Sequence, residues 1–145
     1  MKRLLPEELP RLRPIGHQFT AAAKLPNQFN ELHFENMWRS LITHGLGTIL
    51  YEENEHGVIL GALAFVSNPD MFSGVPTAAE TFLFVLPEAR GSGLASRLLE
   101  EFEKEAKARN CKEVLMVSLS ELETGPLFER RGYKVLETIY RKEIS

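Results

Sequence analysis

Apolar side chains recur along this chain at helical spacing in two long segments. Those between residues 34 and 42 lie three or four positions apart, which predicts a helix over Phe34–Ile42 that Gly45 ends. The same spacing predicts a longer helix over Gly93–Asn110. Weaker patterns predict short helices over Gln18–Leu25 and Pro126–Arg131. The core face expected of the longest helix consists of Leu94, Leu98, Leu99, Phe102 and Ala106.

Runs rich in β-branched and aromatic residues predict strands between these helices. Asn54–Gly57 has the composition of a hairpin turn, and Ser67–Pro76 that of a loop. The strand, helix and strand over residues 80–119 predict a right-handed crossover between parallel strands. We therefore expect an α/β (α+β) fold with a mixed, largely antiparallel sheet and helices on both faces. The predicted strands are Gly47–Glu52, Val58–Val66, Glu80–Val85, Glu113–Leu119 and Tyr133–Ile144.

Length and composition fit one soluble domain over residues 1–145, with 43% hydrophobic and 26% charged residues. A net charge of −3 argues against a broad basic face for nucleic acid. No apolar run approaches the roughly 20 residues that span a membrane, and Met1–Glu8 lacks the apolar core of a secretory signal. We expect a cytoplasmic protein without nucleic-acid or membrane partners.

The cysteine and histidine content gives no sign of a metal site. Cys111 is the only cysteine, which excludes an internal disulfide and a cysteine-based zinc site. The four histidines have no mutual spacing that would pair them on a helix or strand. We therefore expect no metal ion.

The most informative segment is Arg90-Gly91-Ser92-Gly93-Leu94-Ala95, between a buried strand and the longest helix. Free N–H groups at a helix start attract an anion, and glycine allows close approach to the main chain. No acidic residue occurs from Ala89 to Leu99, whereas Arg90 and Arg97 do. Because the first turn of a helix normally favours acidic residues, cations there indicate a bound anion.

Two other kinds of glycine loop share features with this segment. A phosphate-binding loop of the Walker type needs Gly-Lys-Ser/Thr, which is absent. The dinucleotide-binding fingerprint could use Ser96 as its third small residue. However, that fingerprint usually opens a doubly wound sheet, whose further crossovers take roughly 30 residues each, and the chain ends about 50 residues later. A nucleotide-binding domain remains a disfavoured alternative.

The glycine segment, together with the preceding Val85-Leu86-Pro87, resembles the acetyl-CoA signature of the GNAT superfamily of N-acetyltransferases. The later Leu127–Tyr133 resembles the short helix and Gly-Phe/Tyr step of that family, and the order of elements matches from about Gly47 onward. The resemblance implies a sheet with a splayed central parallel strand pair and acetyl-CoA as co-substrate.

The resemblance also implies where acetyl-CoA binds. The pantetheine arm would lie between the strand that ends at Val85 and the one that begins near Glu113, pairing with the main chain of Leu83, Phe84 and Val85. A β-bulge near Leu86 and Pro87 would separate the two strands. Ser118 is a weaker candidate for contact with the arm. The diphosphate would bind the amides of Gly91, Ser92, Gly93, Leu94 and Ala95, with Arg90 beside them.

Catalysis of acetyl transfer requires a base for the amine and donors for the thioester oxygen. Glu80 lies near the position at which several members of the family carry a catalytic glutamate, so it is the expected base. The main-chain amide of Val85 or its neighbour is the expected donor. Many members have a tyrosine acid where this chain has Phe128, which leaves Tyr140 and Tyr133 as substitutes. The coenzyme A thiol is a good leaving group, so an acid is not essential.

These residues predict an N-acetyltransferase that acts on a primary amine of a small molecule, an amino acid or a peptide end. The helix Phe34–Ile42 and the loop Ser67–Pro76 are the expected walls of the acceptor site. A catalytically silent acyl-CoA-binding or protein-interaction module on the same fold is the alternative, supported by Phe128. Members of this family often dimerise through late strands, so a homodimer is compatible with the resemblance.

Overall fold

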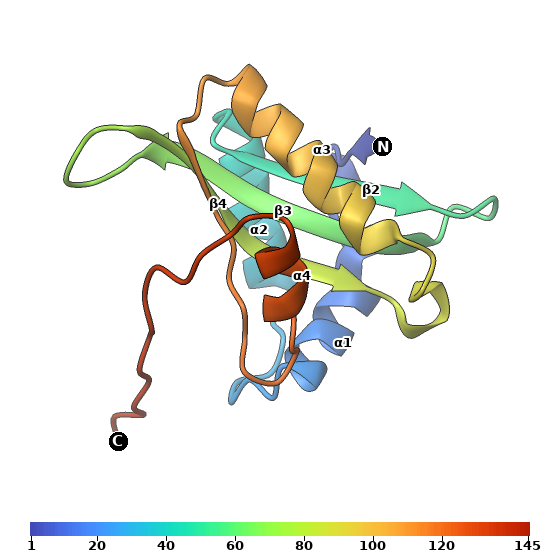
Figure 1. Ribbon diagram of the computed structural model, residues 1–145. Coiled ribbons are helices and arrows are strands. Elements are labelled where there is room, and N and C mark those ends of the chain that lie inside the picture. The colour runs from blue at the N-terminus through green and yellow to red at the C-terminus, as the bar shows by residue number, and fades with distance from the viewer.

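The computed structural model describes residues 1–145 and contains one five-stranded sheet. Its strands lie in the order of the chain, so that β3 is central (Figure 1). Neighbouring strands are antiparallel except β4 and β5, which are parallel. This agrees with the predicted mixed, largely antiparallel sheet. The strands are β1 (Lys2–Arg3), β2 (Gly47–Glu53), β3 (Ile59–Pro69), β4 (Pro76–Val85) and β5 (Glu113–Leu115).

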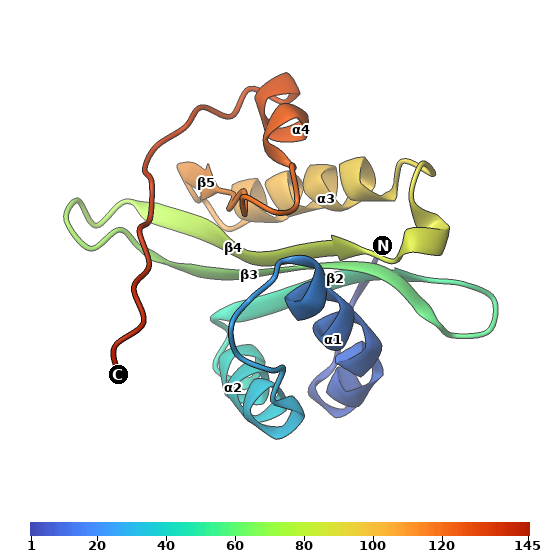
Figure 2. The same ribbon diagram turned by 90° about the horizontal axis from the view of Figure 1, so that it is seen from below.

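Helices cover both faces of the sheet and produce three layers (Figure 2). One face carries the 3₁₀ helix η1 (Pro6–Leu12) with α1 (Arg13–Ala22) and α2 (Glu31–Thr43). The other carries α3 (Leu94–Ala108), the crossover between the parallel strands, and α4 (Gly125–Arg130). No helix is both long and apolar enough to cross a membrane.

The alternation of side chains along β2 and β3 divides the core between these layers. Ile49 and Ala64 face η1, α1 and α2, whereas Leu50 and Phe65 face α3. Phe65 packs against Phe102 of α3 with their ring centroids 4.9 Å apart. The spacing that predicted α3 therefore describes the face that it buries: Leu94, Leu98, Leu99, Phe102 and Ala106 are all at most 2% exposed.

Two predictions have wrong boundaries: the loop between β3 and β4, and the first helix. The predicted loop Ser67–Pro76 shrinks to a turn, because β3 continues to Pro69 and β4 begins at Pro76. Asp70 closes this turn by accepting hydrogen bonds from the N–H groups of Phe72 and Ser73. The short helix predicted over Gln18–Leu25 is instead the end of α1, which begins at Arg13 and continues from η1.

The strand predicted over Tyr133–Ile144 is also wrong. This segment leaves α4 and runs past the edge of the sheet without joining it (Figure 2). Its apolar side chains remain in solvent, with Val135 83% exposed and Ile139 79% exposed. The segment has the composition of a strand, but a strand also requires a partner for its backbone hydrogen bonds, and composition does not supply one.

Candidate functional site

The parallel strands β4 and β5 pair only at their beginnings. Thr77 pairs with Glu113, and the ladder ends where Ala79 pairs with Leu115. β4 continues to Val85 beside β3, so its outer edge has no strand partner beyond Ala79. The strand predicted over Glu113–Leu119 is therefore too long, because β5 ends at Leu115. The expected splayed pair is present as a fork between β4 and the segment that follows β5.

Main-chain groups of β4 face the open side of this fork. The N–H of Leu86 donates to Leu60 O of β3 at 2.8 Å. Because successive residues of a strand direct their N–H and C=O groups to opposite edges, those of Leu83 and Val85 point away from β3. The side chain of Arg90 donates to Val85 O at 3.1 Å, which agrees with this direction.

A β-bulge lies at the fork, rather than near Leu86 and Pro87 as predicted. Ala64 pairs with Phe82 and Phe65 with Glu80, so Thr81 is the extra residue. The bulge shifts the alternation of β4: Phe82 faces the α1 and α2 layer, whereas Leu83 packs on the α3 side. Pro87 belongs to the 3₁₀ turn η2 (Pro87–Ala89) after the strand.

Glu80 lies at the point where the two strands separate. Its side chain is only 6% exposed and accepts a hydrogen bond from the N–H of Val117 at 3.0 Å. Burial disfavours the ionised carboxylate and raises the pKa of Glu80 to about 7, although the Val117 hydrogen bond acts in the opposite direction. A carboxyl group with this pKa is able to exchange a proton near neutral pH.

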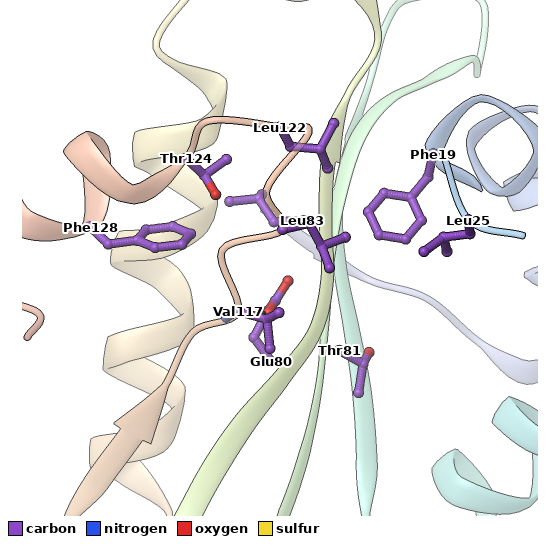
Figure 3. Close-up of a pocket in the computed structure, with 10 residues that line it drawn as sticks. Phe19, Leu25, Glu80, Thr81, Leu83, Val117, Leu122, Thr124 and Phe128 are labelled. Atoms are coloured by element: carbon purple, nitrogen blue, oxygen red, sulfur yellow. Dashed lines mark hydrogen bonds between the residues drawn. The ribbon is translucent and has the colours of Figure 1, made fainter. Parts of the chain in front are cut away.

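A pocket of about 180 Å³ surrounds Glu80 at the open edge of β4 (Figure 3). Phe19 and Leu25 line it from the α1 side, and Thr124 and Phe128 line it from the α4 side. Lys24 and Glu121 form an ion pair with 3.5 Å between Nζ and Oε2, which joins the two flanks. The other lining residues are Thr81, Leu83, Val117, Leu119 and Leu122.

The glycine segment between η2 and α3 presents unpaired backbone donors. Gly91 and Gly93 have φ of 83° and 81°, which glycine adopts without strain. The N–H groups of residues 91–96 donate to no backbone or side-chain acceptor in the protein, and no side chain caps α3. The start of α3 thus retains the free donors that the sequence predicted.

The two arginines of this segment differ in their partners. Arg97 is bound by Glu52 of β2, with 2.9 Å between Nε and Oε2, and also donates to Ser92 O. The Arg97 guanidinium lowers the pKa of Glu52. Arg90 forms no ion pair and packs over the ring of Phe84. Arg90, rather than Arg97, is the cation left available to an anion.

The structure does not bring the two candidate tyrosines or Ser118 to Glu80. Tyr133 donates its hydroxyl to Glu103 Oε2 at 2.8 Å, and burial together with this hydrogen bond raises the pKa of Tyr133. Tyr140 is 92% exposed in the C-terminal segment. Ser118 accepts a hydrogen bond from Thr124 at 3.4 Å. Tyr133, Tyr140 and Ser118 do not line the pocket, whereas Phe128 does.

Several pocket residues could not be identified from the sequence. Phe19 and Leu25 come from the N-terminal region, and Leu119 and Leu122 from a segment without regular structure. No local pattern distinguishes them from ordinary core residues. No group of three or more histidine, cysteine and acidic side chains is arranged to hold a metal ion.

Comparisons with known proteins identify relatives of this arrangement. A sequence model described as the acetyltransferase (GNAT) family matches residues 15–133. No curated protein matches the chain in sequence.

Solved structures share the fold at low sequence identity. The predicted acetyltransferase from Clostridium acetobutylicum, solved with acetyl-CoA, has a TM-score of 0.82 at 16% identity, covering 98% of this chain and 94% of the other. The glucosamine-6-phosphate N-acetyltransferase from Arabidopsis thaliana has a TM-score of 0.77 at 15% identity, covering 99% and 97%. The ribosomal-protein-alanine N-acetyltransferase from Brucella melitensis has a TM-score of 0.76 at 17% identity, with the same coverage.

Proposed function

Because this chain belongs to the GNAT family of acetyltransferases, we propose that it transfers an acetyl group from acetyl-CoA to a primary amine. The amine attacks the bound thioester directly, without an acetylated enzyme. The fork beside β4, the free donors before α3 and the buried Glu80 support this proposal. Together they provide a slot, an anion site and a base at one edge of the sheet.

The slot and the anion site suit the two parts of acetyl-CoA. The free N–H groups of residues 91–96 bind the diphosphate, with Arg90 as the accompanying cation. The main-chain groups of Leu83 pair with the amides of the pantetheine arm as an added strand would, which leaves the N–H of Val85 for the thioester oxygen. The N–H groups of residues 91–96 have no partner in the protein, and Leu83 has no strand partner on this edge, whereas Val85 O already accepts a hydrogen bond from Arg90 at 3.1 Å.

Glu80 acts as the base for the acceptor amine. A lysine-like ammonium group has a pKa of roughly 10.4 and no lone pair with which to attack. Since the pKa of Glu80 is about 7, its carboxylate can take a proton from the amine at neutral pH. The proton moves directly or through one water molecule. Burial in the fork keeps this carboxylate close to the thioester.

The neutral amine nitrogen forms a C–N bond with the thioester carbonyl carbon. Because Glu80 already holds the first proton, the second proton from the nitrogen passes to solvent, and Glu80 releases its own proton to solvent after turnover. The carbonyl oxygen gains charge, and the N–H of Val85 stabilises it. The C–S bond breaks with its electron pair on sulfur, which leaves as a thiolate. A thiol pKa of roughly 8.5 makes this a good leaving group, and solvent supplies its proton.

This mechanism requires no tyrosine acid. Phe128 occupies the wall of the pocket that faces Glu80 from α4 (Figure 3). Phe128 is 5% exposed and packs beside Tyr133, with ring centroids 5.9 Å apart. Phenylalanine at position 128, where many members of the family have tyrosine, is the one observation that favours a catalytically silent module. Such a module would bind acyl-CoA in the fork without transferring the acyl group.

The unpaired edge of β4 beyond Ala79, with Glu80 at its start, is the observation that carries the proposal. Two measurements test it. Isothermal titration should detect acetyl-CoA binding at micromolar concentration and no binding of NAD. Release of the coenzyme A thiol in the presence of primary amines then separates an enzyme from a silent module. Absence of acetyl-CoA binding would exclude both.

A further inference from the structure

A second cleft opens on the other side of β4, between α1 and α2. Its volume is about 220 Å³ and its lining residues carry no charge. Most of its wall is aromatic: the lining includes Phe19, Phe29, Phe34, Trp38 and Phe82. For comparison, an apolar cavity of about 150 Å³ is large enough to bind a benzene ring.

Gly16 of α1 allows one wall of this cleft to form. A Cβ atom at Gly16 would lie 2.3 Å from the ring of Phe29, so only glycine permits this ring to rest on the helix. Phe29 in turn packs edge-on against Phe34, with ring centroids 5.2 Å apart. A glycine inside a helix costs about 1 kcal/mol relative to alanine, and here it makes room for the aromatic wall.

Polar side chains of α1 and α2 contact one another outside the lining of the cleft. Arg13 donates to both carboxylate oxygens of Glu35, at 2.8 Å and 3.0 Å. His17 and Glu31 approach to 2.9 Å between Nε2 and Oε2. The Arg13 guanidinium lowers the pKa of Glu35, so this carboxylate stays ionised and paired. No carboxylate lines the cleft to attract a second cationic group of a ligand.

The cleft adjoins the pocket around Glu80. Phe19 and Thr81 line both cavities. Thr81 is the bulge residue and directly follows the expected base. Its hydroxyl donates to Ala64 O at 3.2 Å, so this hydroxyl is not a free donor at the junction. A molecule with its amine at Glu80 would reach the aromatic cleft past these two shared residues.

We propose that this cleft binds an apolar side group of the acceptor, so that the preferred substrate is a primary amine carrying an aromatic or long aliphatic group. The inference rests on the proposed function, since it places the reacting amine at Glu80. The aromatic wall and the uncharged lining favour a neutral apolar group there. Each methylene buried in such a cleft should raise kcat/KM about fourfold.

A series of amines that differ only in their apolar group tests this inference. Thiol release is measured with ethylamine, butylamine, hexylamine and phenethylamine. Independently of turnover, the emission of Trp38, the only tryptophan, reports filling of the cleft that it lines. We expect kcat/KM to increase along the series, and hexylamine and phenethylamine to change the emission at concentrations at which ethylamine does not.

Variants of α1 provide the matched comparison. Thr20 lines the cleft, whereas Gln18 is exposed on the same helix. Thr20→Phe should lower the kcat/KM ratio of phenethylamine to ethylamine at least tenfold, whereas Gln18→Leu should leave it unchanged. Gly16→Ala, which displaces the Phe29 ring, should also lower the ratio. Thermal unfolding verifies that each variant is folded.

The outcomes separate this inference from the proposed function. Equal kcat/KM for all amines, with no change in Trp38 emission, would overturn the apolar acceptor site and leave acetyl transfer standing. Emission changes without thiol release would support the apolar cleft and contradict the proposed function. Aromatic rings also attract cations. Stronger binding of tetramethylammonium than of phenethylamine would therefore overturn the apolar assignment as well.

Discussion

The carboxylate of Glu80 accepts a hydrogen bond from the backbone N–H of Val117 at 3.0 Å, across the point where β4 and β5 separate. The Glu80 side chain thus joins the two segments just beyond Ala79 and Leu115, the last residues that pair in the ladder of β4 and β5. This contact holds the segment after β5 beside β4 while the main chain of β4 stays open. It also places a titratable group at the closed end of the fork.

The first prediction concerns the pH dependence of turnover. With saturating acetyl-CoA and amine, kcat should fall about tenfold per pH unit below the pKa of Glu80, which is about 7, because the protonated carboxyl cannot accept a proton. Glu80→Gln should lower kcat by roughly 10²- to 10⁴-fold and remove this ionisation from the profile. Steady-state assays of thiol release at several pH values measure both effects.

Glu105→Gln is the matched control, since Glu105 is also buried, 8% exposed, but pairs with Arg3 and Arg109 away from the pocket. This variant should keep the pH profile of the wild type. If Glu80→Gln turned over amines at the wild-type rate at every pH, Glu80 would not be the base.

The second prediction concerns stability. Burial raises the pKa of Glu80 from 4.5 to about 7 in the folded protein, so the folded state binds more protons than the unfolded state between these values. The free energy of unfolding contributed by this group therefore decreases as pH rises through this range, by about 3 kcal/mol at most. Glutamine cannot ionise and should not show this loss.

Urea unfolding of the wild type and Glu80→Gln at pH 5 and pH 8 measures the difference. Relative to the wild type, the variant should gain stability between the two values, and other titrating groups cancel in the comparison. A difference in stability that did not change with pH would show that Glu80 is not buried as a neutral acid.

The third prediction concerns the diphosphate site. Gly91→Ala should weaken acetyl-CoA binding about tenfold, because a Cβ would project where the diphosphate approaches the main chain. Gly57→Ala is the control: Gly57 has φ of 77°, Gly91 has φ of 83°, and in each case a Cβ would meet no atom within 4 Å. Both variants should lose roughly 1 kcal/mol of stability. Isothermal titration should find weaker binding in Gly91→Ala alone.

The fourth prediction concerns the tyrosines. Tyr133→Phe should lower the free energy of unfolding by about 1 kcal/mol through loss of the hydrogen bond to Glu103, without lowering kcat. Tyr140→Phe should change neither quantity, because its side chain lies in solvent. Chemical denaturation and thiol release measure the two quantities. A drop of tenfold or more in kcat for either variant would identify a tyrosine acid.

Local patterns in the sequence were sufficient for elements whose structure depends on near neighbours. The helical spacing of Leu94, Leu98 and Phe102 determined the face that α3 buries, since side chains three and four residues apart share one side of a helix. The glycines at 91 and 93 indicated the turn, because their φ values of 83° and 81° are unfavourable for other residues. Those signals also located the free donors of the proposed diphosphate site.

Contacts between distant segments were decided only in the tertiary structure. The burial of Glu80 depends on Val117 and on residues from α1 and α4, and its pKa follows from that burial. The length of β5 and the unpaired course of Tyr133–Ile144 depend on whether another strand lies within reach, which composition does not encode. The aromatic cleft likewise arises only when Phe29 packs on Gly16. Spacing along a chain reports on neighbours in sequence, whereas a pocket is formed by residues that folding brings together.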